Sequence, residues 1–296
     1  MPELSRPVFR ITFSDRIADI IDGKPVLRCP WQWWQQVIEN KHSQPTEFSS
    51  AGEAGHKVAE LYGRHCVSSE VDKDMEYFEH LVNRLTSGAD LFGLKFDSDD
   101  AWYQTVWNFA AIARFNPAHE HYFESKFAFS RENYERLQLI EGPGRYNVKQ
   151  LADYAAGQVD HFAMKNESEG TLTDYKMGYR NITDWQEAEN SLQMLMYAWA
   201  CFLLWPELQK VTANLWGPMW GRNNRSTAVF MRDETIAKCE AWLNWQFLFL
   251  DELWEKHGKD WPANESDACR YCSLLCPIYL ATEEQYPDIT EKVKVA

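Results

Sequence analysis

The sequence contains no apolar run of about 18 residues or more, the length that a transmembrane helix requires. Its first residues, Met1 to Arg6, also lack the apolar stretch of a secretory signal. These two absences predict a protein that stays in the cytosol and does not enter a membrane. With 296 residues and 45% hydrophobic content, the chain is long enough to bury a large core.

Positive charge is also scarce, because 30 Lys and Arg residues stand against 44 Asp and Glu residues and the net charge is −14. This balance argues against a protein that binds nucleic acid through its bulk charge, since such domains are usually basic. An acidic enzyme can still carry a local basic groove, and a bound Mg²⁺ or Mn²⁺ offsets negative charge at its site. The charge alone therefore does not decide whether the protein binds nucleic acid.

The cysteine content does not predict a disulfide framework, because the number is odd and the chain has no secretory signal. There are seven cysteines, at positions 29, 66, 201, 239, 269, 272 and 276. Cys269, Cys272 and Cys276 crowd together, and Cys29 is the strongest candidate for a fourth ligand. Four thiolates suit either Zn²⁺ or a [4Fe–4S] cluster. The other three thiols lie in apolar helical patterns and are expected to be buried.

The spacing of apolar residues predicts helices and strands in a mixed order. Helices are expected at 31–40, 50–64, 182–204 and 233–257, with Asp233 capping the last, and two more within 71–115. Strands are expected at 121–129, 209–217 and 225–231, and a hairpin at 157–176. This order predicts an α/β fold with a mixed central β-sheet flanked by helices. We expect one domain over 1–296, with a helical insertion at about 65–118 and a cysteine-rich segment at about 258–282.

The predicted hairpin carries the residues of greatest chemical interest. Side chains alternate along a strand, so Asp174 and Lys176 project from one face, and Asp160 can join them from the partner strand. Two carboxylates and a lysine at this spacing suit metal-dependent cleavage of a phosphodiester, because the carboxylates hold a divalent cation and the lysine lies beside the attacking water. A solvated hairpin with a surface ion pair is the alternative.

Other residues can complete a metal site with this hairpin. His56 lies in a predicted helix beside two glycines, and the main-chain carbonyl of Tyr175 is a candidate fourth ligand. A nitrogen ligand shifts the preference from Mg²⁺ toward Mn²⁺. Glu124, expected on the strand face opposite Phe123, Phe127 and Phe129, is a candidate for a further metal or water ligand; a surface pair with Lys126 is the alternative.

A second polar pair lies on the helix predicted after the hairpin. Gln193 and Tyr197 are four residues apart and therefore share a face. An amide and a phenol in this arrangement can contact a phosphate or a base, although a half-buried helix face explains the pair equally well.

Taken together, the motifs resemble the RecB-like branch of the PD-(D/E)XK nuclease superfamily. They run in that family's order from residue 29 to residue 277: Cys29-Pro30, Gly52 with His56, Gly157 with Asp160, Asp174-Tyr175-Lys176, Gln193 with Tyr197, and the C-terminal cysteines. The sequence has no P-loop lysine motif, so it is most similar to the stand-alone CRISPR-associated or phage-encoded Fe–S exonucleases of prokaryotic cells.

The resemblance implies a role for each of these residues. His56, Asp160, Asp174 and the Tyr175 carbonyl would bind Mn²⁺ or Mg²⁺, and Lys176 would assist the attack of water. Gln193 and Tyr197 would hold DNA. The four ligands of a [4Fe–4S] cluster would be Cys29, Cys269, Cys272 and Cys276, which would join the two ends of the chain.

The activity that the resemblance implies is that of a DNA exonuclease acting on single strands or frayed ends, with endonuclease activity as a further possibility. The alternative is a DNA-end binding or processing subunit of a recombination or CRISPR-adaptation complex. Two departures from the family pattern stand out. Cys272 and Cys276 are closer together than the family's last two cysteines, and Gln158 replaces the usual arginine of the motif that ends at Asp160.

Overall fold

The computed structural model describes most of the chain between residues 5 and 263. The described residues are 5–12, 18–21, 24–27, 29–41, 47–86, 100–131, 136–140, 153–177, 182, 184 and 187–263. They form a mixed sheet with helices on both faces, which confirms the predicted α/β class. None of the helices in these ranges is both long and apolar enough to cross a membrane.

A seven-stranded sheet organises the described residues. Six of its strands follow one another in the order β5 (Arg136–Ile140), β4 (Glu120–Ser130), β6 (Tyr154–Asn166), β7 (Glu169–Tyr175), β8 (Lys210–Trp216) and β9 (Arg225–Met231). The seventh, β1 (Arg10–Thr12), runs parallel to the first residues of β6. The pair β7–β8 is also parallel, and the other pairs are antiparallel. A separate hairpin consists of β2 (Ala18–Ile21) and β3 (Lys24–Leu27).

The predicted hairpin exists as β6 and β7, with a turn shorter than the polar run suggests. β6 continues to Asn166 and β7 begins at Glu169, so two residues make the turn. The Asn166 side chain accepts hydrogen bonds from the main-chain N–H groups of Ser168 and Glu169, at 2.9 Å each. This side chain replaces main-chain pairing at the tip, as Asn commonly does in turns.

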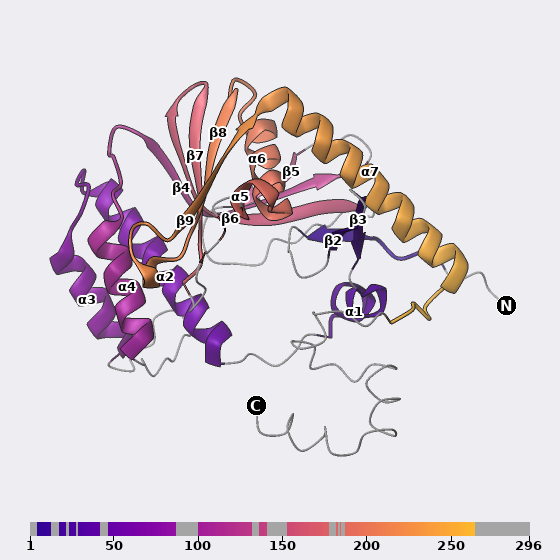
Figure 1. Cartoon of the computed structure of the whole chain (residues 1–296), viewed down its shortest axis with the longest axis horizontal. Coiled ribbons are helices and arrows are strands. Elements are labelled where there is room, and N and C mark those ends of the chain that lie inside the picture. Colours follow the sequence, from indigo (N-terminus) through magenta and orange to yellow (C-terminus); the bar gives the residue numbers. More distant parts are fainter. Residues whose placement is uncertain are drawn as a thin grey trace, which may run out of the picture.

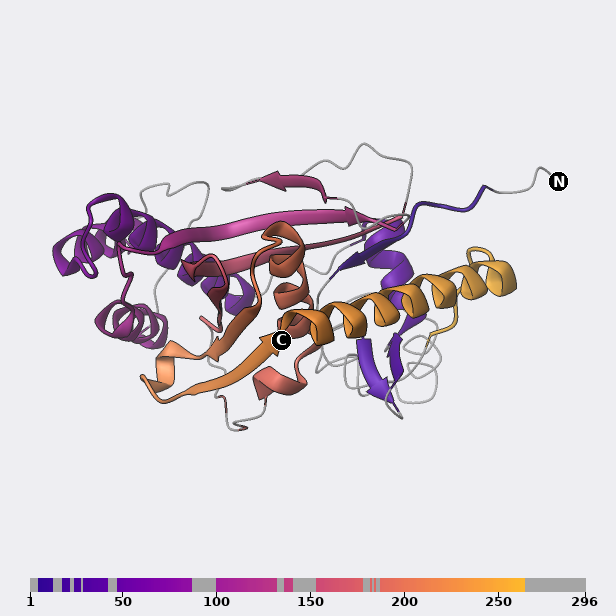
Figure 2. The ribbon, with the colours of Figure 1, turned by 90° about the horizontal axis from the view of Figure 1, so that it is seen from above.

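Helices cover the sheet on both sides (Figure 1). One face packs against α2 (Glu47–Ser68) and α4 (Asp100–Ile112), with α3 (Met75–Thr86) packed on these two helices, and the opposite face packs against α6 (Leu192–Leu204) and α7 (Arg232–His257). Figure 2 shows α2, α3 and α4 gathered at one end of the long strand β4, and α1 (Pro30–Trp33) lies toward the other end. Both α3 and α4 fall inside the predicted insertion; its boundaries stay a prediction.

Two helix predictions were wrong in detail. The expected helix 182–204 is broken, because Ser191 is extended (φ −76°, ψ 116°) between α5 (Glu187–Asn190) and α6. The Ser191 hydroxyl accepts a hydrogen bond from the Met194 N–H and so caps α6. Asp233 does not cap α7; Met231 is the capping residue, and Asp233 lies in the first turn, where its negative charge favours the helix dipole.

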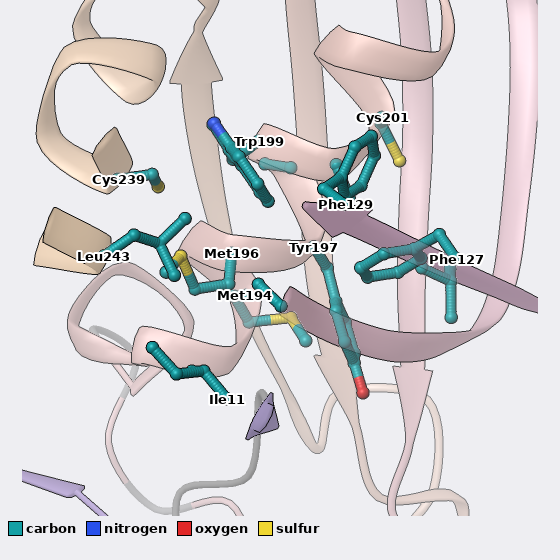
Figure 3. Close-up of a cluster of buried hydrophobic side chains, with 14 of the residues drawn as sticks. Ile11, Phe127, Phe129, Met194, Met196, Tyr197, Trp199, Cys201, Cys239 and Leu243 are labelled. Atoms are coloured by element: carbon teal, nitrogen blue, oxygen red, sulfur yellow. The ribbon is translucent and has the colours of Figure 1, made fainter. Parts of the chain in front are cut away.

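The core on the α6 side is dense in large side chains (Figure 3). Phe127 and Phe129 of β4 pack against Tyr197 and Trp199 of α6, with ring centroids 6.2 and 5.0 Å apart respectively. Cys239 of α7 is fully buried beside this layer, as the sequence predicted for the thiols in helical patterns. The layer holds α6 in a fixed position over the sheet.

A buried charge network joins the first described residues to the start of β6 and to α7. Asp153 is 6% exposed, and its carboxylate accepts hydrogen bonds from the Phe9 N–H at 2.7 Å, from Arg6 at 2.6 Å and from Arg131 at 2.9 Å. Both arginines also pair with Asp251. Burial opposes the charge on Asp153, but these donors outweigh that effect and hold its pKa below the usual range.

We predict that Asp153→Ala lowers the free energy of unfolding by about 3 kcal/mol, because it leaves the buried Phe9 N–H without an acceptor and removes one of the two carboxylates that pair with the arginines. Asp251→Ala is the matched control, since Asp251 shares both arginines but is more exposed, and it should cost at most about 1 kcal/mol. Urea unfolding measures both values. Equal losses in the two variants would show that the buried N–H does not matter.

Candidate metal centre

The candidate site lies where strand pairing along β6 changes partner. On one side β6 pairs with β4. On the other side, residues 154–156 pair with β1, and β7 begins to pair only from His161. Asp160 therefore falls in the interval between the two partners. There the Tyr175 N–H donates to the Asp160 carboxylate, at 2.7 Å, in place of a main-chain acceptor.

Asp174 and Lys176 lie at the end of β7, on the face that the sequence predicted for them. Leu172 packs into the core on the α6 side and Tyr175 into the core on the other side, so Asp174 shares the α6 side with Leu172. Asp174 is 3% exposed. Its Oδ2 atom accepts no hydrogen bond from a described residue, but the Lys176 ammonium lies 2.7 Å from it as an ion pair.

The Tyr175 carbonyl, a predicted ligand, is directed toward the same place. The Lys176 N–H donates to the Trp216 carbonyl of β8, at 2.8 Å. Since the peptide is trans, the Tyr175 carbonyl points the opposite way, toward β6. The structure therefore places this oxygen on the Asp160 side of β7.

His56 reaches the site because α2 packs very closely on the end of β7. A Cβ atom at Gly55 would lie 2.6 Å from the Met177 Cβ, so only glycine permits this approach. His56 follows directly in α2, and its Nδ1 atom lies 3.4 Å from an Asp160 oxygen. One contact between a helix and a strand end thus brings residues of two separate sequence motifs together.

Glu124 joins the site through an unusual backbone conformation. Its φ angle is +49°, in the left-handed region that residues with side chains rarely adopt. The sequence analysis was wrong to place Phe123 on the same face as Phe127 and Phe129. Phe123 packs in the α2 side of the core and the other two on the α6 side, because side-chain alternation breaks at Glu124.

The Glu124 carboxylate is held by two neighbours. One oxygen lies 3.7 Å from His56 Nδ1, and the Gln158 amide donates to the other in a short hydrogen bond. Gln158 is the residue that departs from the motif described above, and no pattern in the sequence indicates its contact with Glu124. His56, Glu124 and Asp160 together bring three possible ligand atoms within 4.8 Å of one another. Asp174 lies outside this group of three.

The electrostatics of this group favour a bound cation. Burial raises the pKa of Asp160 above its usual range, and the Asp174 and Glu124 carboxylates add to the effect, while His56 opposes it. Burial lowers the pKa of His56, but the attraction of Asp160 and Glu124 outweighs burial and raises it. Protons therefore stay on the group at neutral pH, and a cation that displaces them would relieve the repulsion between the carboxylates.

The donor set fits a hard divalent ion. It offers the carboxylate oxygens of Glu124 and Asp160, one imidazole nitrogen and the Tyr175 carbonyl, with the Asp174 carboxylate beside them in its ion pair with Lys176. Carboxylate and carbonyl oxygens suit Mg²⁺ and Mn²⁺, and the nitrogen favours Mn²⁺.

Gln193 and Tyr197 lie beside the site and form a chain to Lys176. The Lys176 ammonium donates to the Gln193 side-chain oxygen at 3.3 Å, and the Gln193 amide donates to the Tyr197 hydroxyl at 2.9 Å. The Tyr197 ring is buried in the core below. This pair therefore positions Lys176, a role that the sequence analysis did not foresee.

The predicted cysteine cluster can be followed only in part. Cys269, Cys272 and Cys276 lie outside the described residues. Cys29 is buried at the start of α1, where its sulfur accepts a hydrogen bond from the Gln32 N–H. Close by, the Trp31 N–H donates to the Pro262 carbonyl at 3.0 Å, so the chain leading to the three cysteines lies against α1.

Comparisons with known proteins identify a family for this chain. The model of a family described as "PD-(D/E)XK nuclease superfamily" matches residues 24–276. No curated protein sequence matches the chain. Among solved structures, one described as "Crystal structure of SSO0001" is similar at 10% identity, with 84% of this chain and 95% of that chain covered and a TM-score of 0.27. A similarity at that TM-score carries no argument about function.

We predict that Mn²⁺ raises the melting temperature and that the increase is larger at about pH 8.5 than at about pH 6.5. The sign follows because the raised pKa values of Asp160 and His56 leave protons that the ion must displace, and this cost falls as the pH rises. Thermal unfolding at increasing Mn²⁺ concentration measures the effect. A shift that is the same at both pH values would contradict it.

We also predict that Glu124→Gln weakens Mn²⁺ binding by at least about tenfold, since it removes one anionic oxygen donor from the group of three. Glu120→Gln is the matched control, because Glu120 is exposed on the same strand and lies outside the group. Isothermal titration of each variant with Mn²⁺ gives the two affinities. If both variants bind like the wild type, Glu124 is not a ligand.

Proposed function

Because this chain belongs to the PD-(D/E)XK nuclease superfamily, we propose that it is a metal-dependent deoxyribonuclease that hydrolyses phosphodiester bonds at the site around Asp160. The observation that carries the proposal is the meeting of His56, Glu124 and Asp160 beside the Asp174–Lys176 ion pair, at the point where β7 leaves β6. Chance surface charges would not converge from a helix and three strands on one half-buried position.

His56, Glu124, Asp160, Asp174 and the Tyr175 carbonyl would hold the metal ion. When bound, Mn²⁺ or Mg²⁺ stabilises the charge that develops on the phosphate and lowers the pKa of a bound water. The protein residues position the ligand atoms and supply the electrostatic field at the site. The buried carboxylates fix where positive charge can lie, and Gln158 and His56 fix the rotamer of Glu124.

Lys176 is the residue that we assign to the attacking water. Its ammonium is held between the Asp174 carboxylate and the Gln193 side chain, so it needs no rearrangement to face a phosphate at the metal. The Asp174 carboxylate, 2.7 Å away, holds the ammonium in this position. A charged lysine can orient the water and stabilise the additional negative charge of the transition state.

For Gln193 and Tyr197 we propose a double role. They fix Lys176 through their hydrogen bonds, and the same helix edge contacts the DNA strand that enters the site. We further propose exonuclease action on single strands or frayed ends as the main activity. The site lies at a strand end bounded by α2 and α6, and single strands can be threaded to such a position more readily than a duplex.

A second candidate function is a DNA-end binding or processing subunit of a recombination or CRISPR-adaptation complex. The net charge of −14 favours it, because an acidic protein gains from a partner that supplies positive charge along the DNA. Purified protein that binds DNA in Mn²⁺ without cutting it would support this function over the first.

For the cysteines we propose that Cys29, Cys269, Cys272 and Cys276 bind a [4Fe–4S] cluster, with Zn²⁺ as the alternative. The contact of α1 with Pro262 supports it, since only six residues separate Pro262 from Cys269. Stacked rings of Trp33 and Trp261, with centroids 5.3 Å apart, already join the two segments. A cluster there would close a loop of most of the chain and stabilise the fold.

We predict that Lys176→Ala lowers the rate of DNA cleavage by at least about a hundredfold and leaves DNA affinity nearly unchanged, since the lysine assists the chemical step. Cleavage of end-labelled DNA in Mn²⁺ and binding without metal ion measure the two effects. Lys210→Ala is the control, because Lys210 pairs with Glu169 outside the site. A Lys176→Ala protein that cuts as fast as the wild type would show that the assignment is wrong.

We predict that protein purified without oxygen absorbs visible blue light because of a cluster, and that Cys29→Ser abolishes this band. Cys239→Ser is the control, since Cys239 is buried between α6 and α7 and its Sγ contacts the Leu195 carbonyl. Iron and zinc analysis accompanies the spectra. A colourless protein with one zinc ion per chain would establish the zinc alternative.

A further inference from the structure

A cavity lies on the face of the sheet that packs against α2 and α4, away from the side chains of the metal centre. Its volume is about 520 Å³, within the range typical of small-molecule sites. The lining includes Tyr175 but none of His56, Glu124, Asp160, Asp174 and Lys176. We call it the Arg222 pocket.

The charge of the Arg222 pocket is opposite to that of the whole chain. Four cations line it, Arg114, Lys165, Arg222 and Arg225, against a single described carboxylate, that of Asp72. Asp72 lies 3.8 Å from Arg114. Within the described residues, the other three cations form no ion pair. Among the described residues, a protein with a net charge of −14 thus has an excess of positive charge in one cavity, although the Glu169 carboxylate also feels the charge of Lys165.

The two arginines of the β9 side are held close to one another. The Arg225 Nε–H donates to the Arg222 main-chain carbonyl at 3.1 Å, and the Arg225 guanidinium lies 5.7 Å from the Trp216 ring centroid. Burial and the neighbouring Arg222 charge lower the pKa of Arg225. An anion between the two guanidinium groups would relieve this repulsion, and phosphate oxygens match guanidinium geometry best.

The floor of the pocket supplies neutral polar groups. Thr171 and Thr173 of β7 alternate with buried residues and face the pocket, and Asn214 of β8 is the cross-strand neighbour of Thr173. Hydroxyl and amide groups in this arrangement can donate to phosphate or to sugar oxygens. The floor therefore adds hydrogen bonding without adding negative charge.

A chain of hydrogen bonds runs along the wall of the pocket and ends at the Tyr175 hydroxyl. His121 Nε2 lies 2.8 Å from the Asn116 carbonyl and so carries the proton, which makes His121 Nδ1 the acceptor for His161 Nε2 at 3.0 Å. His161 Nδ1 then accepts from the Tyr175 hydroxyl at 3.0 Å. Burial lowers the pKa values of both imidazoles.

We propose that the Arg222 pocket binds a phosphate group of a nucleotide and is a second nucleic-acid contact beside the cleavage site. The proposal rests on the nuclease function only for the identity of the ligand. The nucleotide can belong to the DNA strand beyond the scissile bond, or it can be a free product of cleavage. Tyr175, which contributes its side chain to the pocket and its main chain to the metal centre, links the two sites.

Binding of full-length protein in EDTA, where no cleavage occurs, tests the proposal. The probes are a labelled single-stranded oligothymidylate and thymidine monophosphate. The variant is Arg222→Gln with Lys165→Gln, since both side chains are exposed. The matched control is Arg84→Gln with Lys256→Gln, which changes the net charge equally at exposed positions of α3 and α7 outside the pocket. Melting temperatures confirm that both proteins fold.

If the pocket holds the strand, the Arg222/Lys165 variant binds the oligothymidylate about tenfold more weakly, and the slope of log affinity against log salt falls by about 1.4. If it holds a free nucleotide, only thymidine monophosphate binding is lost. Unchanged binding of both probes, relative to the wild type and the control variant, overturns the proposal. Cleavage of DNA by the wild type in Mn²⁺ is measured separately, so a failed nuclease function is not mistaken for a failed pocket.

Discussion

The hydrogen bond from the Tyr175 N–H to the Asp160 carboxylate is the interaction on which the site depends. It satisfies a main-chain donor at the point where β7 stops pairing with β6, so the strands can separate without leaving that N–H unpaired. It also fixes the Asp160 side chain next to the Tyr175 carbonyl. One bond therefore ends the sheet pairing and holds a carboxylate and a carbonyl oxygen together.

The remaining side chains arrive from opposite faces of the sheet, and packing sets their positions. The contact of Gly55 with Met177 brings α2, and with it His56, to one side of the strand end. On the other side, α6 is fixed by its aromatic core, and Gln193 reaches Lys176. A strand end clamped between two packed layers has little freedom to relax, so the acids stay close despite their mutual repulsion.

Part of this arrangement follows from sequence patterns, because strand alternation puts Asp174 and Lys176 on one face and helical spacing puts Gln193 beside Tyr197. The position of the Glu124 side chain does not follow from these patterns. Its place depends on a left-handed backbone at a non-glycine residue, which also sends Phe123 to the other face, and no local pattern announces such a conformation. The helix break at Ser191 also does not follow from local sequence, since a serine within an apolar helical pattern caps a helix only where tertiary contacts require the helix to begin there.

The uneven distribution of charge explains how an acidic chain can serve a polyanionic substrate. At the metal centre, burial and the repulsion between carboxylates disfavour the ionised form of Asp160, so part of the negative charge there is neutralised by protons or by a cation. On the other face of the sheet, three cations stand without carboxylate partners among the described residues. The electrostatic potential that a phosphate group meets near β7 is therefore set by these two local sites more than by the net charge of −14.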